Sequence, residues 1–135
     1  MKTRTDPMAD AEDVTTVKIV INGIAHRDGI MRVALFDSPD GFPGEMDTVY
    51  RRLETPIVDE PVTVTLEDVP AGRYAVSVFH DEDGDGVMET GLFGQPSEGY
   101  GISNDATALF GPPSFEDASF AVASEPVLIR ITMNY

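Results

Sequence analysis

Short runs of β-branched and aromatic residues, separated by glycine, proline and aspartate, dominate this chain. The run Val62-Thr63-Val64-Thr65-Leu66 alternates apolar and polar residues, which is typical of a strand with one buried face. Comparable runs cover 14–21, 30–36, 73–80, 119–123 and 127–133. Residues 47–57 fit either a short helical turn or an edge strand. About seven short strands with turns between them predict an all-β fold, a single antiparallel Greek-key β-sandwich.

One long stretch, 81–117, breaks this pattern because it is dense in glycine, proline and aspartate and has almost no periodicity. Its aromatic residues argue against disorder, and they are Phe93, Tyr100, Phe110 and Phe115. We therefore expect a long ordered loop that leaves the sandwich and returns to it. The polar segment 1–13 is expected to be disordered, which leaves 14–135 as the single folded domain.

The loop begins with three aspartates at alternate positions, followed directly by Gly86. Ca²⁺ takes several oxygen ligands at once, and alternate carboxylates with a glycine at the sixth position are how a calcium loop supplies them. The predicted ligands are Asp81, Asp83, Asp85, Val87 through its carbonyl group, and Glu89 directly or through water. The sequence therefore predicts a Ca²⁺ site in this segment.

The segment departs from a helix–loop–helix calcium site in two ways. Position twelve, which is normally a bidentate glutamate, is Leu92, and the preceding residues 75–79 read as a strand. The remaining ligands would come from the later part of the loop, from Glu98 or Asp105, with His80 as a hydrogen-bonding partner of the site. The alternative is an acidic surface turn that holds no ion.

Three functional hypotheses follow from the loop. In the first, Ca²⁺ orders the 81–117 excursion of a non-catalytic binding or structural module. In the second, segment 92–115 binds a small ligand or saccharide without metal, through residues that include Tyr100, Ser103 and Asn104. The simpler explanation of the aromatic residues in this segment is that they form a small hydrophobic core of the loop itself. The third is a hydrolase using His80 and Asp81 with Ser103 or Ser114, but no Gly-x-Ser-x-Gly elbow supports it.

The charge of the chain limits its partners. The formal net charge is −15, which argues against nucleic acid and anionic lipid and favours a divalent cation. The chain has no cysteine, so disulfides and thiolate metal sites are excluded, and no apolar run is long enough for a transmembrane segment. Residues 1–13 lack the apolar region of a signal peptide, so export would require that one had been removed. The sequence leaves the oligomeric state open.

Two motifs resemble known families. Pro70-Ala71-Gly72-Arg73-Tyr74-Ala75-Val76 resembles the turn and strand of transthyretin-like and carboxypeptidase-regulatory-like sandwiches. In that motif the glycine makes the tight entry to the strand and the tyrosine packs back into the core. Gly72 can take a positive φ, and the Tyr74 hydroxyl can reach a backbone partner while its ring is buried.

More specifically, the chain resembles the bacterial family called domain of unknown function 2141. The resemblance rests on His80-Asp81-Glu82-Asp83-Gly84-Asp85-Gly86, on Phe93-Gly94 with Pro96 and Glu98-Gly99-Tyr100-Gly101 with Ser103-Asn104, and on Phe110-Gly111-Pro112-Pro113-Ser114-Phe115. It implies a small β-sandwich that is usually exported to the periplasm, envelope or cell surface, and it implies no established activity. Asp83 and Asp85 stand where members often have asparagine, which makes this loop more anionic.

Overall fold

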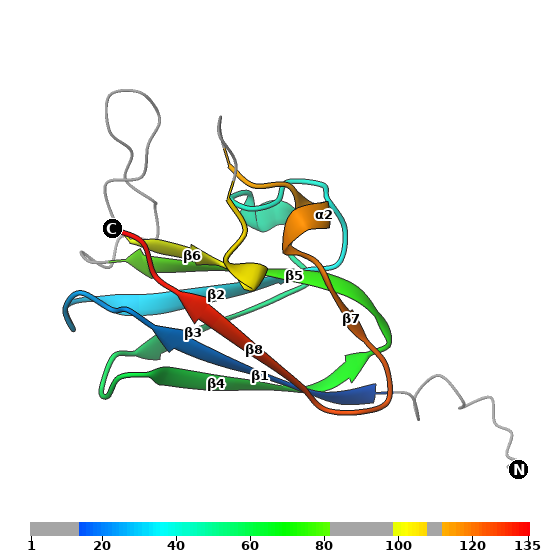
Figure 1. Cartoon of the computed structure of the whole chain (residues 1–135), viewed down its shortest axis with the longest axis horizontal. Coiled ribbons are helices and arrows are strands. Elements are labelled where there is room, and N and C mark those ends of the chain that lie inside the picture. The colour runs from blue at the N-terminus through cyan, green and yellow to red at the C-terminus, as the bar shows by residue number, and fades with distance from the viewer. Residues whose placement is uncertain (1–13, 82–98, 108–111) are drawn as a thin grey trace, which may run out of the picture.

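The computed structural model describes residues 14–81, 99–107 and 112–135, and this part of the chain is all-β, with eight strands in two sheets (Figure 1). The three-stranded sheet contains β1 (Val14–Asn22), β4 (Val62–Pro70) and β8 (Val127–Thr132). The five-stranded sheet contains β2 (Ile30–Phe36), β3 (Arg51–Pro56), β5 (Gly72–Asp81), β6 (Tyr100–Ile102) and β7 (Phe120–Val122). The predicted all-β class is confirmed.

Within the described residues, helical structure is limited to three short turns, η2 (Met46–Thr48), η3 (Ser103–Asp105) and α2 (Phe115–Ala118). Of the two alternatives for the run 47–57, the edge strand is confirmed, because β3 covers Arg51–Pro56 at the edge of the sheet, whereas η2 ends at Thr48. No helix in the described ranges is long and apolar enough to cross a membrane.

Strand β1 lies at the centre of the three-stranded sheet, between β4 and β8. It pairs antiparallel with β4 but parallel with β8, where Val17 is opposite Val127 and Ile21 is opposite Ile131. The prediction of a purely antiparallel fold is wrong at this one pairing. A tight hairpin forces neighbouring strands to run antiparallel, but β1 and β8 are joined through all the other strands, so no such constraint acts on them.

The five-stranded sheet is organised around β5, the longest strand. β5 pairs with β2 from Ala75 to Asp81, and it also pairs with β7 near Tyr74 and with β6 near Phe79. β6 falls inside the stretch 81–117, which was expected to be loop. Part of that excursion is therefore a strand of the sheet.

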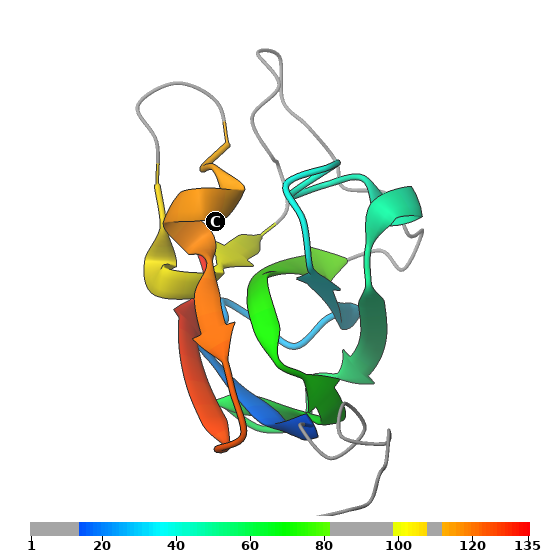
Figure 2. The ribbon, with the colours of Figure 1, turned by 90° about the vertical axis from the view of Figure 1, so that its right-hand side faces the viewer.

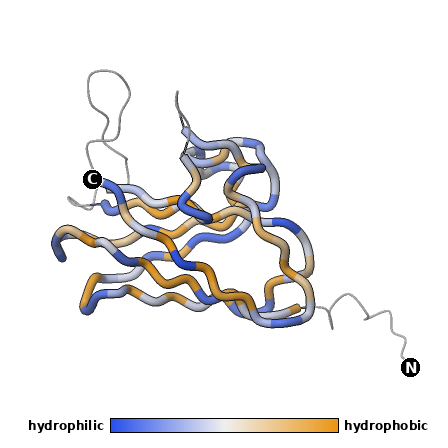
Figure 3. Tube along the Cα trace, in the orientation of Figure 1, coloured by the Kyte–Doolittle hydropathy of each residue, from blue (hydrophilic) through white to orange (hydrophobic). Residues whose placement is uncertain are grey.

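The two sheets lie face to face and enclose one hydrophobic core (Figures 1 and 2). Alternate residues of each strand point into it, as expected from the period of two, and hydrophobic residues concentrate along the strands in Figure 3. Side chains that are completely or almost completely buried there include Val17, Ile19, Ile21, Met31, Val33, Leu35, Val76, Val78 and Ile131.

A second, smaller cluster covers the outer face of the five-stranded sheet at one end. The Phe42 ring packs edge-on against Phe36 and Phe115, with ring centroids 5.2 and 5.9 Å apart. Ala75, Ile102 and Ala118 form its buried base. This packing holds α2 and the turn around Phe42 against the sheet, so the aromatic side chain of Phe115 serves as packing of the excursion; Phe93 and Phe110 lie outside the described residues.

The turn before β5 has the geometry that its motif predicts. The Tyr74 side chain is 4% exposed, and its hydroxyl donates a 2.7 Å hydrogen bond to the Pro70 carbonyl oxygen. Gly72 enters the strand with a φ of 158°. Burial is the main cause that raises the pKa of the Tyr74 phenol above its ordinary value.

Candidate functional site

Asp81, the first of the predicted calcium ligands, is the last residue of β5 and is completely buried. Its Oδ2 atom accepts a 2.7 Å hydrogen bond from Nε of Arg32 on β2. Arg32 also forms an ion pair with Glu54, directly opposite on β3. The hydrogen bond to Asp81 is the largest cause that raises the pKa of Arg32, so this guanidinium stays charged. A row of alternating charge thus crosses three neighbouring strands.

His80, the residue before Asp81, points to the opposite face of β5 and is also completely buried. Its Nε2 lies 2.6 Å from the Asp28 carbonyl oxygen and its Nδ1 lies 2.7 Å from the Tyr135 hydroxyl. A carbonyl oxygen can only accept, so Nε2 carries a proton, and in the neutral ring Nδ1 accepts from Tyr135. The ring of His26 lies 4.7 Å from that of His80.

These contacts give His80 a connecting role. One ring nitrogen binds the turn that contains Asp28, and the other binds Tyr135, after the last strand. The backbone amide of His80 also donates to the Gly99 carbonyl oxygen at 2.9 Å. His80 therefore joins segments that are distant in the sequence, and both of its ring nitrogens are engaged within the protein.

Ser103, Asn104 and Asp105, which were predicted as additional metal or ligand contacts, form η3 and make hydrogen bonds with the backbone. The buried Ser103 hydroxyl accepts from the Val76 amide at 2.9 Å and donates to the Ala118 carbonyl at 2.6 Å. Nδ2 of Asn104 donates to the carbonyl oxygens of residues 117 and 119. Oδ1 of Asp105 accepts from the Thr132 amide at 2.9 Å.

The structure does not bring this group together with Asp81. Ser103 lies beside Val76, whereas Asp81 lies five residues further along the same strand. At a rise of about 3.3 Å per residue this is a separation of about 16 Å. Oxygen atoms that share one Ca²⁺ each lie about 2.3–2.6 Å from the ion, so Asp105 and Asp81 do not share an ion in this arrangement.

Tyr100 is half-buried on β6, where it pairs with Phe79 and packs against the small aromatic cluster. Its backbone also exchanges two hydrogen bonds with Asn134. The glycines on either side face residues near Tyr135: a Cβ atom at Gly99 would overlap the Tyr135 ring, and one at Gly101 would lie 2.6 Å from Cγ2 of Ile131. Alternate glycines in a strand mark such a close approach, and this signal was available in the sequence.

No group of three or more acidic or histidine side chains that could hold a metal ion occurs within residues 14–81, 99–107 and 112–135. The remaining predicted ligands, Asp83, Asp85, Val87, Glu89 and Glu98, lie outside the described residues, as does the expected disordered segment 1–13. Asp81 is the residue through which the predicted metal loop joins the folded sheet.

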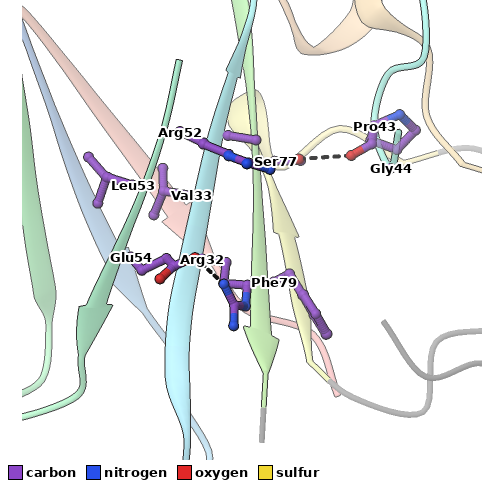
Figure 4. Close-up of a pocket in the computed structure, with 10 residues that line it drawn as sticks. Arg32, Val33, Pro43, Gly44, Arg52, Leu53, Glu54, Ser77 and Phe79 are labelled. Carbon is purple, nitrogen blue, oxygen red and sulfur yellow. Dashed lines mark hydrogen bonds and ion pairs between the residues drawn. The ribbon is translucent and has the colours of Figure 1, made fainter. Parts of the chain in front are cut away.

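A hollow of about 110 Å³ opens on the outer face of the five-stranded sheet, beside the Arg32–Glu54 pair (Figure 4). Arg52 of β3 and Phe79 of β5 line it, and Pro43 and Gly44 close one side. Arg51 and Arg52 are adjacent in the sequence but have different surroundings. Nη1 of Arg51 donates to the Glu67 carbonyl oxygen at 2.7 Å, and Arg52 faces the hollow.

Comparison with known proteins assigns the chain to a family but to no individual relative, since no curated protein and no solved structure matches it. A bacterial family described as "Uncharacterized protein conserved in bacteria" (DUF2141) matches residues 19–130. This range includes six complete strands, β2 to β7, together with parts of β1 and β8 and the Asp81 end of β5. The chain therefore belongs to the bacterial family called domain of unknown function 2141.

Proposed function

We propose that this protein is a non-catalytic, calcium-binding module, and that Asp81 is the fixed first ligand of its metal loop. The single observation that carries the proposal is the position of Asp81, a completely buried carboxylate at the last residue of a core strand. Asp83 and Asp85 follow it at alternate positions, so the loop would begin from an oxygen ligand that the sheet already holds in place.

Electrostatics favour a cation at this point. The chain carries a formal net charge of −15, and the loop adds further carboxylates directly after a buried one. Bringing carboxylates together without a cation is costly, because each negative charge disfavours the next. Arg32 balances part of this charge through Oδ2 of Asp81, and the divalent ion would balance the rest.

We propose a non-catalytic role because the side chains that could act in catalysis are engaged in hydrogen bonds within the protein. Both ring nitrogens of His80 are engaged by Asp28 and Tyr135. The Ser103 hydroxyl is buried between two backbone groups, and Ser114 accepts from the Asp117 amide at the start of α2. A nucleophile needs an adjacent base and access to substrate, and neither serine has this arrangement.

We further propose that the domain is a single transthyretin-like Greek-key sandwich that acts in the periplasm or at the cell surface. The Tyr74 hydroxyl bond to Pro70 supports the sandwich, since a tyrosine that bonds back to the preceding turn is a hallmark of such folds. The bacterial family match and the resemblance of the chain to usually exported members support the location.

The test is a thermal melt of the chelator-treated protein with Ca²⁺, with Mg²⁺, and with neither ion. Ca²⁺ at about 100 times its Kd stabilises the folded state by about 2.7 kcal/mol, which raises Tm by several degrees. We expect this rise with Ca²⁺ only, and its loss in Asp83→Ala and Asp85→Ala. Asp59→Ala is the matched control, because Asp59 is an exposed aspartate outside the loop.

Two results would contradict the proposal. An equal rise with both ions, or one that survives Asp83→Ala and Asp85→Ala, would reflect general screening of the negative charge. No rise with either ion would mean that the aspartates form a solvated acidic turn.

A further inference from the structure

The hollow on the outer face of the five-stranded sheet has a chemical character unlike the rest of this acidic chain. Strand alternation places Arg32 and Ala34 of β2, Arg52 and Glu54 of β3, and Phe79 of β5 on this face. Two of the seven arginines therefore face one small cavity in a protein with 24 acidic residues. The formal net charge of −15 disfavours anions in general, so two arginines beside one cavity stand out.

The two arginines differ in what they bind. Arg32 is held by Asp81 and Glu54. Arg52 is exposed, and its side chain makes no hydrogen bond or ion pair in the part of the chain that the structure describes, residues 14–81, 99–107 and 112–135. In Figure 4 its side chain extends from β3 across β2 toward Ser77. A guanidinium with five donors thus lies over the hollow and is not neutralised by the protein.

The walls of the hollow are preformed and partly apolar. Ser77 donates a 2.9 Å hydrogen bond to the Pro43 carbonyl oxygen, which fixes the wall formed by residues 43 and 44 to the sheet. Ala34, 4% exposed, leaves room because its side chain is a single methyl group, and Phe79 offers a half-buried ring. The volume of about 110 Å³ is well below the ~300–1,000 Å³ of sites for drug-sized ligands, so the occupant is small or is one end of a larger molecule.

We propose that this hollow binds a small organic monoanion, with its carboxylate on Arg52 and an apolar or single-ring body against Phe79 and Pro43. Guanidinium matches carboxylate in geometry and charge, and the contact is stronger where part of the water is excluded. Glu54 at the rim disfavours a second negative charge on the ligand. The proposal does not depend on calcium, because the hollow is formed by the described strands and by the turn at Pro43.

Nuclear magnetic resonance of the ¹⁵N-labelled, chelator-treated protein tests it. Sodium benzoate is the probe, benzamide is its neutral counterpart, and sodium chloride keeps the ionic strength constant. We expect saturable shifts of the Ala34, Ser77 and Phe79 amides with a Kd in the millimolar range, and at least about tenfold weaker binding of benzamide, the typical worth of one charge-assisted hydrogen bond.

Three variants separate the site from general attraction of anions. Arg52→Gln should weaken benzoate binding about tenfold. Arg130→Gln, the matched control, removes the same charge from an exposed position on the three-stranded sheet and should leave Kd unchanged. Glu54→Gln should tighten binding, because it removes the carboxylate at the rim.

The proposal is overturned if benzamide binds as tightly as benzoate, or if both arginine variants weaken binding equally. It is also overturned if the shifts stay linear with benzoate concentration or fall outside the hollow. Because the measurement is made without calcium, failure here is distinguishable from failure of the proposed metal loop.

Discussion

Nε of Arg32 donates a 2.7 Å hydrogen bond to Oδ2 of Asp81, although the two residues are 49 positions apart in the sequence. The contact joins the middle of β2 to the last residue of β5. Asp81 is completely buried, while the Arg32 side chain is 26% exposed, so the carboxylate is shielded from solvent and the guanidinium is partly hydrated. The same guanidinium contacts the hollow, so it lies between the two proposed sites.

Arg32→Ala should therefore destabilise the fold by about 2–3 kcal/mol. This is less than the ~3–5 kcal/mol typical of breaking a fully buried pair, since water already reaches Arg32. Urea unfolding at neutral pH, followed by circular dichroism, measures the change. Arg52→Ala on the same face is the control and should cost no more than about 0.5 kcal/mol. Equal effects of the two variants would show that the contact with Asp81 adds little stability.

Ser103→Ala should be costly for a different reason. The Ser103 hydroxyl satisfies the Val76 amide and the Ala118 carbonyl inside the protein, so its removal leaves two buried backbone groups without this partner. At about 1–3 kcal/mol for each such group, we expect a loss of about 2–4 kcal/mol. Ser124→Ala, at an exposed position, is the control for the same chemical change. A loss below about 1 kcal/mol for Ser103→Ala would mean that water replaces the hydroxyl group.

Tyr74 should make stability depend on alkaline pH. Burial raises the pKa of its phenol above 10.0 in the folded protein, so the folded state favours the neutral, protonated form. Its contribution is complete below pH 10 and is lost as the pH rises through the folded-state pKa. In a spectrophotometric titration of the phenols, a late step should therefore appear above the ordinary tyrosine pKa of about 10.

Tyr74→Phe should remove that late step and cost about 1–2 kcal/mol at neutral pH, since the Pro70 carbonyl loses its donor. Tyr50→Phe is the control because Tyr50 is 40% exposed and shows no such burial. If the late step persists in Tyr74→Phe, it belongs to another tyrosine.

Gly101→Ala should destabilise the contact between β6 and β8. The added Cβ would lie 2.6 Å from Cγ2 of Ile131 and 3.0 Å from Sδ of Met133, so the strands must move apart. Such overpacking costs about 1–3 kcal/mol. Gly44→Ala is the control, because a Cβ there meets no atom within 4 Å. Thermal melts of the two variants compare them directly, and equal Tm values would show that the strands adjust without strain.

Much of the strand content follows from sequence alone, because alternation is a local signal. Val62–Pro70 alternates between buried and exposed positions along most of its length, as its residue types require. Tyr74 and Pro70 are four residues apart, so a short sequence motif is enough to predict their contact.

The features that could not be predicted from the sequence depend on residues far away along the chain. β6 has three residues, Tyr100-Gly101-Ile102, which is too short for a period, and only the edge of β5 makes it a strand. The role of Arg52 depends on a turn at Pro43 that covers the neighbouring strands. The contacts of Ser103 likewise come from β5 and α2, at 27 and 15 positions away.

The parallel pairing of Val17 with Val127 has a consequence for how the chain is made. Among the strands that the structure describes, β1 is synthesised first and β8 last, yet β8 covers one edge of β1. Until β8 leaves the ribosome, that edge has open backbone groups beside apolar side chains such as Ile19 and Ile21. Contacts between such distant segments close slowly, so the nascent chain can pair with another chain through this edge until β8 has been made.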